Sequence, residues 1–196
     1  MTDKLTISFL EKPDFQEAIR VISIAMEQNP VNIAVYQGGA ENIRKNIERD
    51  FLELFSDLSG IVFTCKADGQ IVGVMRMRSC DGRDDLDKQD DIDEPGDIGR
   101  RKSIWLKDWA SRDPQESHWH LGPIGVLPGY QRKGIGSKLL RRFCQEVDAC
   151  LAPAYLETDE LQLVPFYEKF GFELVAESEI FGVKNSFMWR SPIREG

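Results

Sequence analysis

The segment between Ile124 and Lys138 constrains the fold of this chain more than any other part of the sequence. A strand-like run that ends at Val126 leads into a glycine-containing turn, and an amphipathic helix begins directly after it. The apolar face of that helix keeps a strict spacing of four residues, at Ile135, Leu139, Phe143 and Val147. Such a stripe predicts a helix that packs on a sheet. Because a further strand is predicted at 154–157, we expect a crossover unit with two parallel strands.

The start of this helix is suited to binding phosphate. Helix N-termini carry unpaired backbone N–H groups and a partial positive charge. Gly134 and Gly136 lack the Cβ atoms that would keep a phosphate away from the backbone. Arg132 and Lys133 add two positive charges beside them. A Walker A loop does not fit, because Ile135 stands where that loop has lysine. The alternative from these residues alone is a strand-to-helix turn with no ligand.

Hydrophobic periodicity along the chain predicts a mixed, mostly antiparallel sheet of about seven strands flanked by helices, which is an α/β (α+β) fold. The strands are expected at 5–9, 61–67, 70–78, 119–126, 154–157, 174–180 and 187–190. The helices are expected at 15–26, 41–55, 98–110, 135–147 and 163–170. Asp14 and Glu17 have the spacing of a capping box at the first helix, and Asp68-Gly69 predicts a tight hairpin turn.

The charge of the chain is concentrated in one segment. The net charge of −8 argues against a general binder of nucleic-acid backbones. Residues 81–97 carry nine acidic and two basic side chains. We interpret this segment either as a solvated surface loop or as an acidic lip that attracts a cationic molecule. Trp105, Trp109 and Trp119 either line a cleft beside it or anchor the core.

The four cysteines predict neither a disulfide framework nor a zinc site, because they form no CxxC pair and no histidine stands nearby at ligand spacing. We expect reduced, partly buried thiols at Cys65, Cys80, Cys144 and Cys150. The sequence contains no apolar run of about 18 residues and no apolar signal core, so a cytoplasmic protein without a membrane span is expected.

Two motifs in the second half of the chain resemble those of a known family. The pattern Gln-x-x-Gly-x-Gly at 131–136, which follows a strand ending at 124–126, resembles motif A of the GNAT acetyltransferase superfamily. The later stretch VPFYEKFGF at 164–172 resembles that family's FYxxxGF signature. The two motifs stand in the family's order, with a helix and a strand between them. The resemblance is firm over 118–172, and the element order before it agrees with the family.

This resemblance implies that acetyl-CoA is the cosubstrate, and the residues themselves predict no metal. In the family, the strand corresponding to 118–126 splays from the next parallel strand, and the pantetheine arm lies in the gap. By analogy, the backbone of Ile124, Gly125 and Val126 would contact that arm. The other cofactor-binding residues, which would hold the pyrophosphate, are Gln131, Arg132, Lys133, Gly134, Ile135, Gly136 and Ser137.

The resemblance also implies three catalytic candidates. Tyr167 occupies the position from which many members present a phenol to the departing thiolate, and it either donates a proton there or packs under the cofactor. His120 stands four residues before Ile124, at the spacing of a general base in the histone-acetyltransferase branch. Glu157, at the end of the next strand, is an alternative base that would act directly or through a water. His120 and Glu157 each also have a purely structural interpretation. His118 is a weaker candidate for the base.

One position departs from the family pattern. Many members carry asparagine four residues before the tyrosine, where it contacts the CoA arm, and this chain has Leu163 there. The neighbouring Gln162 is a polar residue that would substitute for it.

Together these residues predict an acetyl-CoA-dependent N-acetyltransferase, in which a small cationic amine or a peptide or protein amino group attacks the thioester directly. The alternatives are a regulatory module that binds acyl-CoA without transfer and a transferase of a longer acyl group. Residues 1–196 are expected to form one domain, with an acidic and aromatic insertion at about 80–117. Neither nucleic acid nor membrane is an expected partner. A homodimer is compatible with the family, in which dimers are common.

Overall fold

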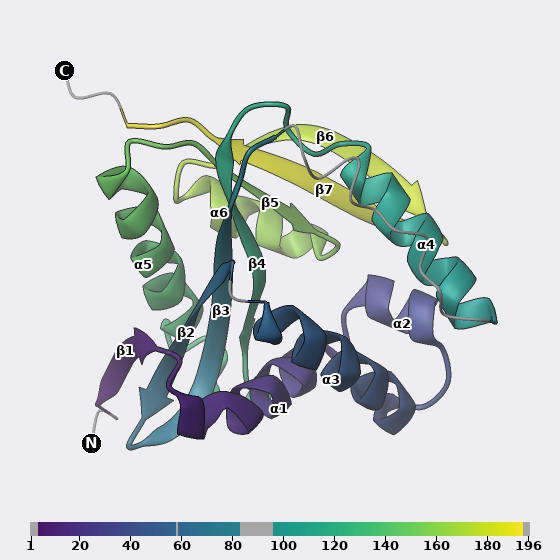
Figure 1. Ribbon diagram of the computed structural model, residues 1–196, viewed down its shortest axis with the longest axis horizontal. Coiled ribbons are helices and arrows are strands. Elements are labelled where there is room, and N and C mark those ends of the chain that lie inside the picture. Colours follow the sequence, from purple (N-terminus) through teal and green to yellow (C-terminus); the bar gives the residue numbers. More distant parts are fainter. Residues whose placement is uncertain (1–3, 58, 83–95, 194–196) are drawn as a thin grey trace.

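The computed structural model describes residues 4–57, 59–82 and 96–193, which form one seven-stranded sheet with helices on both faces (Figure 1). The strand order is β1-β2-β3-β4-β5-β7-β6. Each neighbouring pair is antiparallel except β4 and β5, which are parallel. The predicted mixed sheet is therefore confirmed. Most of the acidic segment 81–97 lies outside the described residues.

The elements agree closely with the periodicity of the sequence. The strands are β1 (Leu5–Phe9), β2 (Gly60–Ala67), β3 (Gln70–Cys80), β4 (His118–Val126), β5 (Ala154–Thr158), β6 (Glu173–Ile180) and β7 (Val183–Arg190). The α-helices are α1 (Phe15–Met26), α2 (Pro30–Tyr36), α3 (Ala40–Ser56), α4 (Asp97–Ala110), α5 (Ile135–Ala149) and α6 (Val164–Glu168). Short 3-10 turns lie at Lys12–Asp14, Pro128–Tyr130 and Leu161–Leu163.

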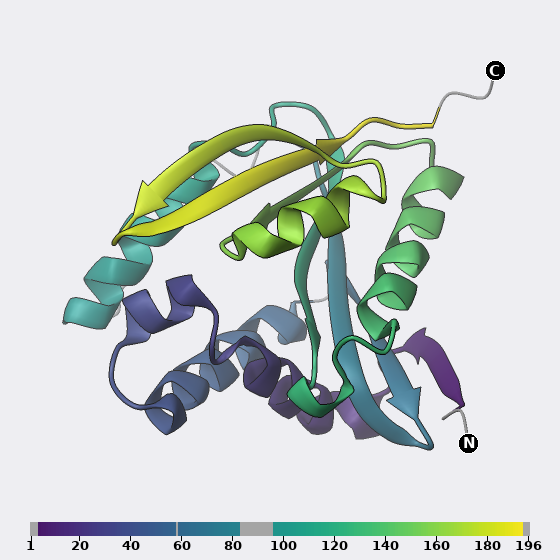
Figure 2. The ribbon, with the colours of Figure 1, turned by 180° about the vertical axis from the view of Figure 1, so that it is seen from behind.

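One face of the sheet is covered by α5 and α6, which lie in front of it in Figure 2. The predicted apolar stripe of α5 is buried, and its four side chains are at most 1% exposed: Ile135, Leu139, Phe143 and Val147. They pack with Met75 and Met77 of β3 in the main core. Burial of a side chain of this size stabilises the fold by about 1.5–3 kcal/mol.

The opposite face is covered by α1 and α3. Ile22 of α1 and Phe55 of α3 pack there against Val62 and Val74 of the sheet. A third cluster joins α2 and α3 to α4 and to the β6–β7 turn. Helix α4 therefore connects the N-terminal helices with the last two strands, as Figure 1 shows.

Three predicted details are wrong. The segment after Pro30 forms the seven-residue helix α2, which the sequence did not predict. The capping box at α1 is absent, because Asp14 belongs to a 3-10 turn and binds Lys66 at 2.6 Å instead. The helix expected at 163–170 is shorter and begins with a 3-10 turn.

Within the part of the chain that the structure describes, no helix has both the length and the apolar character needed to cross a membrane.

Candidate active site

The parallel strands β4 and β5 separate soon after they meet. Their only paired positions in the described chain are Trp119 with Ala154 and His120 with Tyr155. Beyond these positions β4 pairs with β3 alone, while β5 pairs with β7 alone. The result is a V-shaped opening between the two strands, as the family resemblance implied.

The N-terminus of α5 presents free backbone at this opening. No side chain caps the helix, and its first helical hydrogen bond runs from the Lys138 N–H to the Gly134 carbonyl, at 3.0 Å. Gly134 has a φ of 80°, a left-handed conformation that favours glycine. A Cβ on Gly136 would meet only the Phe166 ring of α6, at 3.9 Å. The three N–H groups of 135–137 therefore precede the first helical bond, an arrangement suited to an anion.

The turn before α5 is shaped by its own side chains. The Gln131 amide donates a 3.1 Å hydrogen bond to the Val126 carbonyl, which holds the turn against the end of β4. Arg132 is exposed, and its φ of 60° is also left-handed. The Lys133 ammonium lies 4.8 Å above the Tyr130 ring. Two exposed cations thus stand beside the free helix end. Ser137 is half-buried, whereas Ile135 belongs to the core.

The three residues of β4 that were predicted to contact the cofactor lie in two different environments. Ile124 and Val126 pack against the main core on the α5 side. A Cβ on Gly125 would lie 2.7 Å from Ile22 and 2.8 Å from Ala25, so this glycine lets α1 approach the sheet. Gly125 was predicted from the family as a cofactor contact, and its packing gives it a structural role as well.

His120 and Glu157 form a close polar pair across the parallel strands. The Nε2 atom of His120 lies 2.7 Å from Oε2 of Glu157, across the parallel strands. The His120 side chain is 21% exposed, whereas that of Glu157 is only 5% exposed. The buried carboxylate thus orients an imidazole that solvent still reaches. Trp119 and Leu121 contact the α5-side core, so strand alternation places His120 on the face covered by α1 and α3.

The environment of His120 favours its charged form. Burial by itself lowers the pKa of the imidazole, but the charge of Glu157 and its hydrogen bond act in the opposite direction. Arg78 opposes the imidazolium and Asp113 favours it. The net result is a pKa of His120 above the ordinary histidine value. The imidazole therefore becomes a proton acceptor only at a pH above that of an ordinary histidine.

His118 has a different environment on the same face. Its Nδ1 lies 2.7 Å from the Glu116 carbonyl, and the residue is 5% exposed. Burial lowers the pKa of His118, so its imidazole is held neutral. This histidine packs against the rings of Tyr155 and Trp189.

Tyr167 of α6 is buried within the main core and is 5% exposed. Its ring packs edge-on against Phe166 and Phe172. Burial raises the pKa of Tyr167, and the charges of Glu160 and Asp159 raise it further. The phenol is therefore held in its protonated form, the form that a proton donor requires.

The loop after β5 is tied to α2. Oδ2 of Asp159 accepts a 2.7 Å hydrogen bond from the Val31 N–H, and Oδ1 accepts one of 3.3 Å from the Asn29 amide. The Gln162 amide, considered as a substitute for the family's asparagine, donates to Glu160 at 2.8 Å. Asp159 was not predicted as a site residue, and no local signal marks it, because its partners lie far away in the sequence.

The three tryptophans considered in the sequence analysis do not lie together. Trp119 packs against the α5-side core, so it does not share a cleft with the tryptophans of α4. Trp105 and Trp109 stack edge to face with ring centroids 5.1 Å apart.

All four cysteines are free, as predicted, but Cys150 is exposed rather than partly buried.

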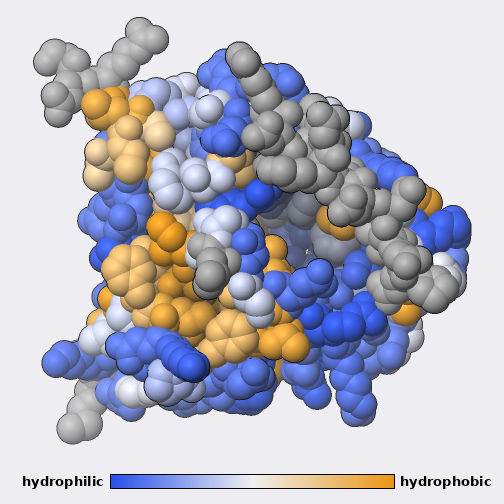
Figure 3. All heavy atoms as spheres, viewed as in Figure 1, coloured by the Kyte–Doolittle hydropathy of each residue, from blue (hydrophilic) through white to orange (hydrophobic). Residues whose placement is uncertain are grey.

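The face that carries α3 and α4 is hollowed beside β4, as the space-filling view shows (Figure 3). Polar residues border much of this hollow, whereas an apolar surface lies to one side of it near β1. That apolar side holds a separate open hollow of about 680 Å³, with Phe9, Phe15, Phe55 and Ile61 among its lining residues. Its lining includes none of the site residues predicted from the sequence.

The fold is that of a mixed α/β protein whose parallel strand pair opens beside a free, glycine-bearing helix N-terminus. Residues 21–172 match the Acetyltransferase (GNAT) family, and the chain belongs to this family. It is therefore a member of a class of acyl-group transferases.

Solved structures with the same fold support this assignment. One is a Corynebacterium glutamicum protein described as histone acetyltransferase HPA2 and related acetyltransferase, with 20% identity, a TM-score of 0.71 and coverage of 97% of this chain and 98% of that one. Another is arylalkylamine N-acetyltransferase 2 from Aedes aegypti, with 15% identity, a TM-score of 0.72 and coverage of 96% and 99%. A third is a GNAT family acetyltransferase from Brucella melitensis in complex with acetyl-CoA, with 19% identity, a TM-score of 0.55 and coverage of 99% and 94%.

Proposed function

We propose that this protein is an acetyl-CoA-dependent N-acetyltransferase whose acceptor is a primary amine, carried by a small cationic molecule or by a peptide. The observation that carries the proposal is the His120–Glu157 pair, 2.7 Å apart and on strands that separate beside the free N-terminus of α5. Direct acetyl transfer to an amine needs two parts, a base and a helix end that binds phosphate, and both lie at this strand pair.

The residues present fit acetyl-CoA. The N–H groups of 135–137 would hold the pyrophosphate, and Arg132 and Lys133 would neutralise part of its charge. The backbone of 124–126 would hydrogen-bond the pantetheine arm on the side of β4 that faces away from β3. When bound, acetyl-CoA supplies an acetyl group activated as a thioester.

His120 is the proposed general base. An amine is mostly protonated at neutral pH, so a proton must leave it before or during attack. The imidazole accepts this proton, and the carboxylate of Glu157 stabilises the resulting imidazolium at 2.7 Å. Tyr167, which is held as a phenol, donates a proton to the departing thiolate and regains one from solvent.

The acidic segment 81–97, which runs from the end of β3 to the first residue of α4, supports a cationic acceptor by attracting positive charge. Exposed charges act over roughly 10 Å at 0.1 M salt, so a cationic acceptor should show a KM that rises with ionic strength.

We further propose that 1–196 is one domain, in which about 80–117 is an insertion.

The test is acetyl transfer from acetyl-CoA to a panel of amines, namely spermidine, tyramine and a short peptide with a free N-terminus. The acetylated products should be identified by mass spectrometry, because the exposed Cys150 would react with a thiol reagent. We expect transfer to at least one of the amines, and loss of most of it in His120→Gln. Binding of acetyl-CoA without transfer to any amine would instead favour the regulatory module.

A further inference from the structure

His120 is held by two residues of β5, Tyr155 and Glu157. In the register of β4 and β5, His120 pairs with Tyr155, and Glu157 lies two residues further along β5. The imidazole is hydrogen-bonded to Glu157 and lies against the Tyr155 ring, with ring centroids 5.8 Å apart and planes tilted by 45°. A hydrogen bond fixes one atom of the imidazole, whereas the ring contact restricts its rotation.

Tyr155 is itself fixed from the other side. It is fully buried, and its hydroxyl donates a 3.2 Å hydrogen bond to the backbone carbonyl of Arg112, just after α4. Burial and then the charges of Glu157 and Asp113 raise the pKa of Tyr155, so the phenol keeps the proton that this bond requires. The orientation of the ring therefore depends on the position of Arg112.

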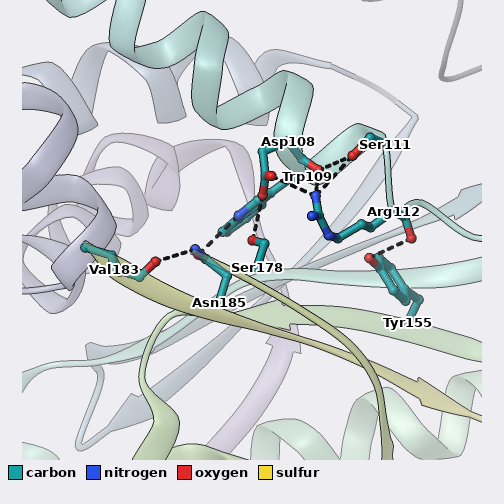
Figure 4. Close-up of polar contacts among 8 residues, drawn as sticks. All are labelled: Asp108, Trp109, Ser111, Arg112, Tyr155, Ser178, Val183 and Asn185. Carbon is teal, nitrogen blue, oxygen red and sulfur yellow. Dashed lines mark hydrogen bonds and ion pairs between the residues drawn. The ribbon is translucent and has the colours of Figure 1, made fainter. Parts of the chain in front are cut away.

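Arg112 is locked in place by α4 (Figure 4). Its Nη1 donates to Oδ1 of Asp108 at 2.7 Å and to the Asp108 carbonyl at 2.8 Å. The other carboxylate oxygen of Asp108 accepts a 2.6 Å hydrogen bond from the Ser178 hydroxyl of β6. The guanidinium also lies over the Phe187 ring of β7, at 5.4 Å.

A second contact fastens the same end of α4. The Trp109 indole N–H donates to Oδ1 of Asn185 at 3.2 Å. Asn185 is fully buried, and its own amide donates to the Val183 carbonyl at 3.0 Å, which fixes its orientation. Figure 4 shows both contacts on the same side of α4, facing β6 and β7. The last turn of the insertion helix is therefore rigidly placed with respect to β5.

We propose that Tyr155 is a positioning residue for His120, and that the end of α4 sets its orientation through the carbonyl of Arg112. This inference rests on the proposed function, in which His120 is the base. It gives the insertion a role beyond covering the sheet, because α4 then helps to fix the geometry of the proton acceptor.

The test is the titration of His120 followed by NMR, which needs neither acetyl-CoA nor an acceptor. The chain has only two histidines, so the His120 signals are assigned by comparison with His120→Gln. The other titratable or charged groups that face this imidazole are Glu157, Arg78, Asp113 and His118, and they stay unchanged in each variant. Tyr155→Leu removes the ring contact, whereas Tyr155→Phe removes only the hydroxyl.

We expect the pKa of His120 to fall by about 0.5 or more in Tyr155→Leu, because a freer imidazole makes a weaker bond to Glu157. Tyr155→Phe keeps the ring but loses the bond to the Arg112 carbonyl, so it should shift the pKa in the same direction by a smaller amount. Asp108→Ala removes the carboxylate that binds Arg112 and leaves His120 unchanged, so it should shift the pKa of His120 in the same direction. This variant provides the test if Tyr155→Leu does not fold. Tyr36→Phe is the control, since Tyr36 is also buried and its hydroxyl also donates a hydrogen bond, here to the carboxylate of Asp50.

An unchanged titration of His120 in folded Tyr155→Leu, or in folded Asp108→Ala if the first variant does not fold, would overturn the proposal and leave Tyr155 as a core residue. The proposed function fails separately, if acetyl transfer by the wild type does not depend on His120. The two failures are distinguishable, because the titration measures the imidazole and the transfer assay measures the reaction.

Discussion

The backbone N–H of Val31 and the carboxylate of Asp159 lie 2.7 Å apart, although the two residues are 128 positions apart in the sequence. Asp159 follows β5 directly and is only 7% exposed. Its carboxylate thus fixes the start of α2 against the loop that leads to Tyr167. One buried side chain connects a helix over one face of the sheet with the edge of the proposed active site.

This contact makes a prediction for stability. Asp159→Ala leaves the buried Val31 N–H without its acceptor, which should lower the free energy of unfolding by about 1–3 kcal/mol. Asp159→Asn keeps an acceptor oxygen and should cost less. The check is urea denaturation of both variants at pH 7. Equal losses in the two would contradict the role of the acceptor oxygen.

The His120–Glu157 pair predicts the pH dependence of transfer. Because the pKa of His120 is raised by Glu157, the base is neutral only above the ordinary histidine range, and kcat/KM should rise with pH through a midpoint above about 6.5. Glu157→Gln removes the charge, while burial still lowers the pKa, so the midpoint should move to lower pH. A midpoint that does not move in Glu157→Gln would contradict the pairing.

The same shift predicts a contribution to stability. A histidine whose pKa is higher in the folded state stabilises the fold below its unfolded pKa, and this contribution is lost as the pH rises through the folded value. Wild type should therefore lose stability relative to His120→Gln as the pH rises above about 6.5. Thermal unfolding of both proteins from about pH 5.5 to about pH 8.5 measures this difference in stability. A constant difference across the series would argue against the raised pKa.

Tyr167 gives a prediction for catalysis. Tyr167→Phe keeps the buried ring but removes the proton donor, so kcat should fall by about 100-fold or more while the KM for acetyl-CoA stays nearly unchanged. Steady-state kinetics with saturating acceptor measures both values. A variant with wild-type kcat would leave Tyr167 only its packing against Phe166 and Phe172.

Much of the fold follows from periodicity, and α2 shows where periodicity fails. The stripe of α5 was predicted because its four residues recur at one helical spacing. In α2, Val31, Ile33 and Val35 alternate as in a strand, and the helix has only seven residues. Such a short helix depends on tertiary contacts, here with Asp159, rather than on local propensity.

The candidate site was likewise only partly predictable from the sequence. The glycine turn was recognisable because a free helix N-terminus has a local signature, and the structure leaves that end uncapped. His120 and Glu157 were each predicted from position and family resemblance, but their hydrogen bond depends on the register of two strands that are distant in sequence. Tyr155 was missed for the same reason, because its contacts with His120 and Arg112 are both tertiary.

Thermal stabilisation by acetyl-CoA is the measurement that shows whether acetyl-CoA binds at the N-terminus of α5. Ligand at 100 times its Kd stabilises the folded state by about 2.7 kcal/mol, so a rise in Tm is expected in the wild type. Gly136→Glu places a carboxylate where the pyrophosphate is expected, while Gly39→Glu puts the same residue at the start of α3, where a Cβ meets nothing within 4 Å. We expect Gly39→Glu to keep the shift and Gly136→Glu to lose it. No shift in folded wild type at millimolar acetyl-CoA, or a full shift in Gly136→Glu, would contradict binding at this helix end.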